Sequence, residues 1–407
     1  MIRYRCRRLV SMNSAPVEDG AFVVAGNRFI DAGPAKEVLS RHAGEYEDLG
    51  DVIVLPGLIN AHCHLDYSSL RGSMLPSRNF PQWISRINAL KRSLTDDDYL
   101  AAMEVGLNEL RSFGVTSVFN IVATPQILPR LPAPRIRTWH FLELIDIRPR
   151  PWLDEPAFGS WLFFESAPDW SGGFGVSPHA PYTASAELYL AAIRASRDFN
   201  MPFTTHLAES STEYEMFACG KGELFDFLSK MGRRMSDCGR LSPFRLLALS
   251  GLLPPNAILV HMNELDDADL AILGRKEWRS VSIVHCPKSS RFLHHRSFPF
   301  EALRDRGLCL CLGTDSLASN DSLNLFAEMR MAARSYAFLS PKELLQMVTV
   351  NPARAIGLDR WLGRIAPGYL ADAIAIPIKD GRHDVYEEVL NYRDAVLWMM
   401  ADGKLLA

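Results

Sequence analysis

The 407-residue sequence lacks the features of a membrane or secreted protein. No apolar run reaches the roughly 18 residues that a membrane-spanning helix needs, and the first residues, MIRYRCRRLVSM, contain no apolar core of a signal peptide. The seven cysteines are scattered, odd in number and without a C-x-x-C pair, which is typical of reduced thiols rather than of a disulfide framework. We therefore expect a cytoplasmic protein without membrane contact.

The sequence also lacks an excess of either charge. Its 44 lysines and arginines nearly balance 47 aspartates and glutamates, so nothing favours nucleic acid or an anionic membrane as a partner. Two zinc-enzyme patterns are missing, the H-E-x-x-H of zincin proteases and the H-x-E with P-C-x-x-C of cytidine-type deaminases. A chain with 48% hydrophobic and 22% charged residues has the composition of an ordinary globular protein, so we expect a small-molecule partner.

Short apolar runs alternate with helix-like segments through the central part of the chain. Segments 96–114 and 185–200 have apolar residues at helical spacing and end at Gly114 and Asn200. The apolar runs that we interpret as strands are 52–65, 116–122, 136–144, 173–182, 201–209, 257–265, 281–287 and 308–316. This alternation predicts an α/β fold, a distorted TIM-type (β/α)8 barrel.

The two ends of the chain differ in character from its centre. Segment 18–33 holds two brief apolar runs around Gly26 and Asn27, which is typical of a hairpin, and segments 363–378 and 395–407 also have the pattern of strands with turns. We therefore predict a small β-sandwich domain built from residues 1–54 and 365–407, beside a barrel that spans residues 55–364. The longest interruption, 219–253, is expected between the fifth and sixth barrel strands.

The first predicted barrel strand ends in two histidines, in the stretch PGLINAHCHL. Side chains two residues apart point to the same side of a strand, so His62 and His64 converge while Cys63 points away. Eleven histidines in 407 residues give roughly 0.3 such pairs by chance, so the pair alone does not establish a metal site. The alternative interpretation is two hydrogen-bonded histidines of the core or surface.

The other predicted strands also end in polar residues, namely His179, His206, His261, His285 and Asp315. The carboxyl ends of the strands form the face of a TIM barrel on which active sites are built. Zn²⁺ binds imidazole nitrogens and carboxylate oxygens, and a catalytic site leaves one position open for water. His62, His64, His206 and Asp315 supply such a set. For each histidine taken alone, the alternatives are a packed core residue or a loop cap.

Glu209 lies three residues beyond His206, where the fifth strand gives way to a loop or helix. Its carboxylate could therefore reach a substrate without being a metal ligand. The alternative is a carboxylate that stabilises the N-terminus of the following helix.

These motifs resemble the amidohydrolase superfamily, and within it the adenine- and triazine-type aminohydrolases. The segments that carry the resemblance are PGLINAHCHL, SPHAPYTAS, TTHLAES, LVHMNEL, IVHCPKSS, LGTDSLASNDSLNLFAEMR and GRIAPGYLADAIAI, in the order of the family. The resemblance implies one divalent metal ion held by His62, His64, His206 and Asp315, with Zn²⁺ expected first and Fe²⁺ as the alternative. The fourth strand has no lysine of the kind that two-metal relatives carboxylate, which favours a single ion.

The resemblance also implies a deamination mechanism. Glu209 moves a proton from water to the ring nitrogen of the substrate, His261 hydrogen-bonds the attacking oxygen, and Asp315 accepts a proton before the amine leaves. By analogy His179 and Trp83 line the substrate pocket, and Arg291 near the barrel mouth assists, although packing or a surface ion pair is the alternative for Trp83 and Arg291.

In detail the sequence looks most like the aminodeoxyfutalosine deaminases of an alternative menaquinone route, which implies a purine nucleoside-like substrate. S-adenosylhomocysteine and methylthioadenosine deaminases, guanine- or triazine-type aminohydrolases, chlorohydrolases and a non-catalytic barrel scaffold are the alternatives. The family's Ser-Asn pair after the seventh strand is here Ser289-Ser290. Relatives of this kind are commonly homodimers, and we expect one here.

Overall fold

The computed structural model describes residues 1–77, 79–148, 170–379 and 384–406. Parallel strands at its centre form two sheets, in the orders β14-β6-β7-β8-β9 and β10-β11-β12-β13. Their bounds are β6 (Leu58–His64), β7 (Val115–Val122), β8 (Arg137–Leu144), β9 (Gly172–Pro178), β10 (Thr204–Leu207), β11 (Ile258–His261), β12 (Ser282–His285), β13 (Cys309–Leu312) and β14 (Asp315–Ser316).

The two parallel sheets join into a barrel. A parallel bridge between Val176 and Phe203 connects the edges of β9 and β10. On the other side β14, which follows β13 along the chain, pairs in parallel with β6. β13 and β14 thus act as one strand, and the predicted distorted (β/α)8 barrel is confirmed.

Alternate residues of the barrel strands form a separate apolar cluster inside it. Ile59, Phe119, Phe141 and Val260 belong to this cluster, together with Cys311. β7 and β8 are buried along their whole length, and most of their residues are apolar or β-branched. The barrel interior is therefore a packed core.

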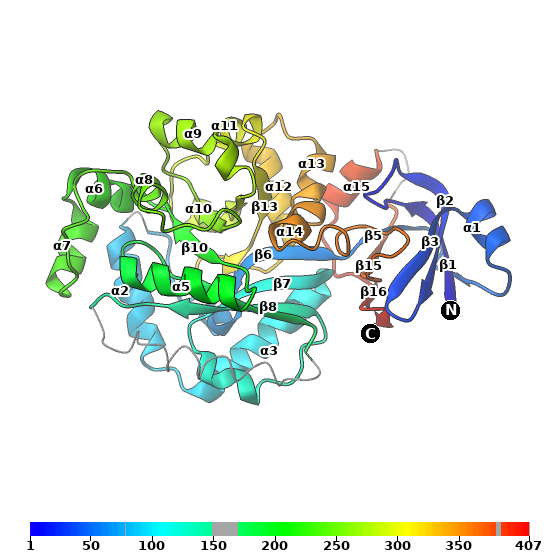
Figure 1. Cartoon of the computed structure of the whole chain (residues 1–407). Coiled ribbons are helices and arrows are strands. Elements are labelled where there is room, and N and C mark those ends of the chain that lie inside the picture. Colours follow the sequence, from blue (N-terminus) through cyan, green and yellow to red (C-terminus); the bar gives the residue numbers. More distant parts are fainter. Residues whose placement is uncertain (78, 149–169, 380–383, 407) are drawn as a thin grey trace.

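Helices follow the strands and cover the barrel from outside (Figure 1). The two helices predicted at 96–114 and 185–200 are α3 (Asp96–Ser112) and α5 (Ala186–Asp198). Gly114 and Asn200, just beyond them, have φ angles of 77° and 51°, so both helices end at a left-handed residue as predicted. The other covering helices are α8 (Pro243–Leu249), α9 (Asp267–Leu273), α10 (Pro287–Phe292), α11 (Phe300–Asp305), α12 (Leu325–Ser335), α13 (Pro341–Gln346) and α14 (Val350–Ala355).

Three helices stand at the carboxyl end of the barrel. They are α2 (Phe80–Lys91), α6 (Ser211–Cys219) and α7 (Glu223–Lys230). Apolar residues of these helices pack into one cluster that includes Phe80, Phe217 and Leu228. Figure 1 shows α6 and α7 at the end of the molecule opposite the two chain termini. Short 3-10 segments complete the connections: η1 (Leu65–Leu70), η2 (Pro125–Arg130) and η5 (Lys276–Trp278).

Strands from both chain ends form one eight-stranded sheet, in the order β17-β16-β15-β5-β1-β2-β3 with β4 beside β1. The bounds are β1 (Ile2–Leu9), β2 (Val17–Ala25), β3 (Arg28–Pro34), β4 (Glu47–Asp48), β5 (Val52–Pro56), β15 (Ala373–Pro377), β16 (Trp398–Ala401) and β17 (Lys404–Leu405), with α1 (Ala35–Arg41) and α15 (Val385–Asn391) beside them. β2 and β3 form the predicted hairpin around Gly26 and Asn27. The division into domains at residues 54/55 and 364/365 remains our proposal.

The chain passes from this sheet into the barrel at Gly57, so the predicted strand 52–65 is two strands, β5 and β6. A Cβ atom at Gly57 would lie 2.2 Å from the side chain of Thr116, which leaves room only for glycine. None of the helices in the described ranges is long and apolar enough to cross a membrane.

Candidate active site and metal centre

Three histidines converge inside the carboxyl end of the barrel. His62 and His64 are on β6, and His206 is on β10. The His62 ring centroid lies 5.0 Å from that of His64 and 4.9 Å from that of His206. Each of the three offers one ring nitrogen, and these atoms all lie within 4.8 Å of one another. The structure therefore brings together the two histidines of the sequence pair and a third from a distant strand.

Several ring nitrogens of this cluster are buried without a hydrogen-bond partner. Both ring nitrogens of His62 and the Nδ1 of His64 have no partner among the described residues. Burial lowers the pKa of His64 well below its usual value and that of His206 to about 3, because the charged form is poorly solvated. The rings of His64 and His206 are therefore neutral, and their Nε2 atoms face each other at 3.2 Å. Such a donor set fits a divalent cation.

Asp315 supplies a carboxylate to the same cluster. Its Oδ1 lies 3.7 Å from His62 Nε2 and 3.8 Å from His64 Nε2. Its Oδ2 accepts a hydrogen bond from the Oγ of Ser289 at 2.6 Å, so one serine of the Ser289-Ser290 pair orients the aspartate. Burial alone would raise the pKa of Asp315, but the neighbouring imidazoles of His62, His261 and His64 hold it well below its usual range.

The approach of Asp315 to β6 depends on a glycine. The predicted strand 308–316 is interrupted at Gly313 and Thr314, between β13 and β14. A Cβ atom at Gly313 would lie 2.8 Å from the backbone oxygen of His62. The close contact lets Thr314 donate its backbone N–H to that oxygen at 3.0 Å and sets the aspartate beside the histidines.

A second group of potential ligands, Glu143, His179 and His206, overlaps with the first. The Nδ1 of His206 faces the carbonyl oxygen of His179 at 2.9 Å and must donate to it, because a carbonyl can only accept. Only the Nε2 of His206 remains to bind a cation, so His206 can serve one of the two groups. The group with His62, His64 and Asp315 offers four ligands and the unpartnered nitrogens, and it fits a cation better.

Glu209, on the loop after β10, lies between two imidazoles. Its Oε1 is 3.3 Å from His295 Nε2 and 3.6 Å from His261 Nε2. Burial alone would raise the pKa of Glu209, but the charge of His261 and the hydrogen bond to His295 lower it to about 2. The N-cap of the following helix is Ser210, whose Oγ accepts from Glu213 N. Glu209 is therefore not the capping carboxylate of that helix.

Sequence reasoning missed two residues that surround Glu209. The carboxylate of Glu213, fully buried on α6, accepts the backbone N–H groups of Ala208 at 3.0 Å and of Glu209 at 2.7 Å. His295 follows α10 in a loop that carries no periodic pattern. An acidic residue on the buried face of the helix after Glu209 is the one signal that could have indicated Glu213.

The remaining predicted histidines divide into two kinds. His261 ends β11, and its ring centroid is 5.9 Å from His62 and 5.5 Å from His206. His285 ends β12, but its ring stacks on Phe298 at 4.3 Å between centroids. His285 therefore packs in the core and does not line the cavity over the histidine cluster.

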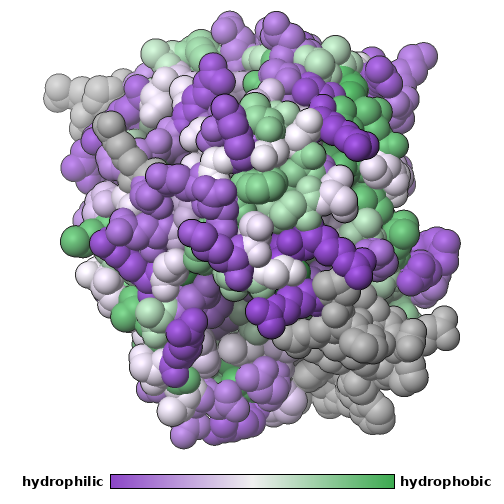
Figure 2. Space-filling model, turned by 90° about the vertical axis from the view of Figure 1, so that its left-hand side faces the viewer, coloured by the Kyte–Doolittle hydropathy of each residue, from purple (hydrophilic) through white to green (hydrophobic). Residues whose placement is uncertain are grey.

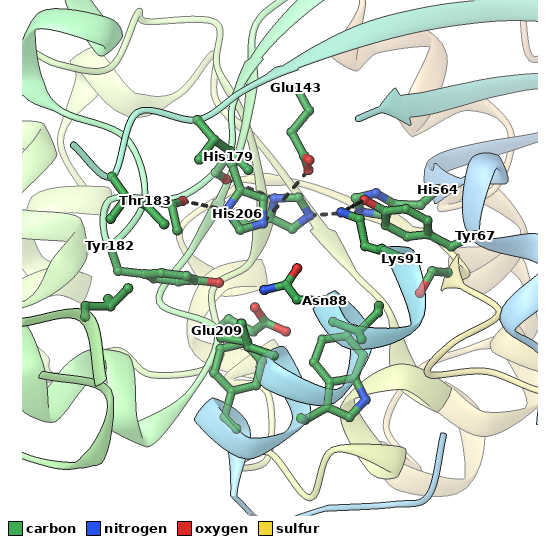
Figure 3. A pocket seen from close by; sticks show the side chains of 18 of the residues that line it. His64, Tyr67, Asn88, Lys91, Glu143, His179, Tyr182, Thr183, His206 and Glu209 are labelled. Carbon is green, nitrogen blue, oxygen red and sulfur yellow. Dashed lines mark hydrogen bonds and ion pairs between the residues drawn. The ribbon is translucent and has the colours of Figure 1, made fainter. Parts of the chain in front are cut away.

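A cavity of about 270 Å³ opens over this cluster (Figure 3). Figure 3 shows His64 and Tyr67 on one side of it and Tyr182 and Thr183 on the other. Two of the three predicted substrate residues, His179 and Trp83, line it together with Glu209. The third, Arg291, lines a separate pocket with Arg71, Lys288 and Met331 among others. In Figure 2, which views the α6–α7 end of the molecule, hydrophilic residues surround smaller hydrophobic areas.

Comparison with known proteins gives the family. The model of the amidohydrolase family matches residues 163–404. The 5-methylthioadenosine/S-adenosylhomocysteine deaminase of Pyrococcus furiosus is 30% identical over 372 residues, which cover 88% of this chain and 83% of that protein. The aminodeoxyfutalosine deaminase of Deinococcus radiodurans is 28% identical over 356 residues, or 83% of this chain and 81% of that protein.

A solved structure shares the fold. The crystal structure of an adenosine deaminase from Xanthomonas campestris with bound zinc has a TM-score of 0.81 and 23% identity, and the match covers 99% of this chain and 92% of that one. With the family model, the relatives and the barrel in agreement, the chain belongs to the amidohydrolase family and is a hydrolase that acts on carbon–nitrogen bonds.

Proposed function

We propose that this protein hydrolyses the amine of an adenine-type ring in a nucleoside-like substrate, and that the substrate is 6-amino-6-deoxyfutalosine, which yields futalosine and ammonia in menaquinone biosynthesis. The observation that carries the proposal is the position of Glu209, held between His261 and His295 in the cavity that His206 and Asp315 also line. The similarity to deaminases of adenine nucleosides supports the substrate class. Methylthioadenosine or S-adenosylhomocysteine is the second candidate, because the Pyrococcus relative is named for both.

The proposal includes one divalent cation, Zn²⁺ first and Fe²⁺ as the alternative, held by His62, His64, His206 and Asp315. The unpartnered ring nitrogens of His62 and His64 and the aspartate beside them support this ligand set. When bound, such a cation is a Lewis acid that lowers the pKa of water to about 7. The backbone carbonyl of His179 fixes the tautomer of His206, which keeps the Nε2 lone pair available.

The residues of the chain then have separate roles. Hydrolysis adds the water oxygen to the ring carbon that bears the amine and breaks the carbon–nitrogen bond, so one water proton goes to the ring nitrogen and the other leaves in ammonia. Glu209 takes the first proton at a carboxylate oxygen and delivers it to the ring nitrogen. His261 donates a hydrogen bond to the attacking oxygen, and Asp315 accepts the second proton for the leaving amine.

His179 and Trp83 are our proposed substrate contacts. Trp83 stacks in parallel on Phe80, with 6.0 Å between ring centroids, and its indole Nε1 has no partner among the described residues. Arg291 would take part only if the substrate extended into the neighbouring pocket. We also propose a homodimer, which light scattering of the purified protein tests.

The test is a substrate panel. Purified protein loaded with Zn²⁺ is incubated with aminodeoxyfutalosine, S-adenosylhomocysteine, methylthioadenosine, guanine and a chlorotriazine, and ammonia or chloride is measured. We expect ammonia from the adenine nucleosides, with the highest kcat/KM for aminodeoxyfutalosine. Glu209→Gln should keep the metal and lose about 10²–10⁴-fold in kcat, because the proton carrier is removed while the ligands remain. Ammonia from guanine alone, or chloride from the triazine alone, would contradict the proposal.

A further inference from the structure

The cavity over the histidine cluster contains one basic side chain besides its histidines. Lys91, the last residue of α2, is the single lysine or arginine among the described residues that line this cavity. The basic residue that the sequence suggested, Arg291, lies in the neighbouring pocket. Any anionic group of a bound substrate in this cavity therefore has Lys91 as its one lysine or arginine partner among the described residues.

The charge of Lys91 is not neutralised within the described part of the chain. Its Nζ donates a hydrogen bond to the hydroxyl of Tyr67 and lies 4.5 Å from the centre of that ring. Burial raises the pKa of Tyr67 well above its usual value, so the hydroxyl is neutral. By contrast, Arg71 is paired with Glu109 and Lys288 with Asp321. Lys91 forms no such ion pair with a described residue.

The carboxylates that line the cavity each lie beside an imidazole. Glu143 Oε1 lies 3.9 Å from His179 Nε2, Glu209 lies between His261 and His295, and Asp315 faces His62 and His64. None of these carboxylates forms an ion pair with Lys91. A cation beside an apolar wall interacts more strongly with an anion than it would in water, because solvent screens it less.

Much of the cavity wall is apolar. Trp83 and Ile87 of α2 face the cavity with Phe227 and Leu228 of α7, and Met231 follows α7. The Tyr67 ring that Lys91 contacts is stacked on His64, with 5.5 Å between centroids and 8° between planes. A substrate extension that reaches Lys91 in this cavity therefore meets aromatic and aliphatic side chains.

We infer that Lys91 binds a carboxylate carried on an apolar extension of the adenine-type substrate. The inference rests on the proposed function and deepens it by naming the charge of the substrate. One ammonium matches a carboxylate monoanion, whereas a phosphate dianion usually collects several donors. Two substrates supply this group: the aromatic carboxylate of aminodeoxyfutalosine and the amino-acid carboxylate of S-adenosylhomocysteine. The apolar wall favours the first.

The experiment compares each acid with its methyl ester, which removes the charge and changes the shape little. We expect the wild-type enzyme to show a kcat/KM roughly tenfold or more higher for aminodeoxyfutalosine than for its ester, the size of one charge-assisted hydrogen bond. In Lys91→Met the ratio of acid to ester should fall to about one, and in Lys91→Arg it should be retained. Arg86→Met is the matched control, because Arg86 is exposed on the same helix, and it should keep the wild-type ratio.

The outcomes separate the inference from the proposed function. A wild-type ratio near one for both acids, or a ratio that Lys91→Met leaves unchanged, would overturn the role of Lys91 while ammonia release still supports the deaminase. A charge preference for S-adenosylhomocysteine alone, lost in Lys91→Met, supports the lysine and assigns it the amino-acid carboxylate. If no nucleoside releases ammonia, the proposed function fails and the inference with it. The wild-type comparison of acid and ester needs no variant to fold.

Discussion

Glu213 offers a sharp test of how the active site is positioned. Its carboxylate accepts the backbone N–H groups of Ala208 and Glu209, and all three residues are buried. Glu213→Gln keeps one accepting oxygen and leaves one N–H without an acceptor, which costs about 1–3 kcal/mol of unfolding free energy. Glu213→Ala leaves both groups unpaired and should cost about 2–6 kcal/mol.

The loss should appear in activity as well as in stability. Without this anchor the loop between β10 and α6 no longer fixes the Oε1 of Glu209 beside His261 and His295, and a misplacement of about 1 Å can cost 100-fold in rate. Urea unfolding and kcat with an adenine nucleoside measure the two effects. Glu215→Gln, the same chemical change on the same helix, is the control, since no backbone N–H is bonded to Glu215 in the described residues. A Glu213→Gln protein with the wild-type urea midpoint and kcat would refute the positioning role.

Three further predictions concern single residues. Burial raises the pKa of Glu328 to about 8 from 4.5, so the folded protein holds this proton more tightly than the unfolded chain does. The free energy of unfolding should therefore be greatest below about pH 4.5 and should fall as the pH rises through 8. Measured from pH 5 to 8, it should fall less steeply in Glu328→Gln than in the wild-type protein, and equal slopes would contradict this. His295→Ala should lower kcat at least tenfold with the metal retained, because Glu209 loses a hydrogen-bond donor; unchanged kcat would remove His295 from the site. Gly313→Ala should lower the free energy of unfolding by about 1–3 kcal/mol, because its Cβ would lie 2.8 Å from the His62 backbone. A thermal melt like that of the wild-type protein would contradict this, because it would mean that β6 and the chain at Gly313 move apart at no cost.

The barrel could be predicted from the sequence because the patterns that indicate its strands and helices are local. Apolar runs such as β7 and β8 are buried on both faces, and helices α3 and α5 have a clear apolar period and a left-handed residue at the end. The breaks at Gly57 and Gly313 were missed, because both depend on a close approach to a strand that is distant in sequence. A run of apolar residues does not reveal that contact.

Residues of the candidate site could be predicted from the sequence where they end a strand, but not where they lie in a loop or on α2. Strand ends of a parallel barrel meet at one face, which is why His62, His64, His206 and Asp315 could be grouped from the sequence. The same rule included His285, whose ring turns instead against Phe298. His295, Lys91 and the pocket of Arg291 depend on how loops and α2 fold over the barrel, and no periodic pattern encodes that.

Metal content measured together with ligand variants tests the central claim most directly. Protein purified with Zn²⁺ supplied, then dialysed and analysed by mass spectrometry for metals, should carry about one equivalent per chain. His62→Ala should lose both the metal and the activity, while Glu209→Gln should keep the metal and lose only the activity. A His62→Ala protein that retains a full equivalent of metal, or a wild-type protein that binds none, would contradict the account.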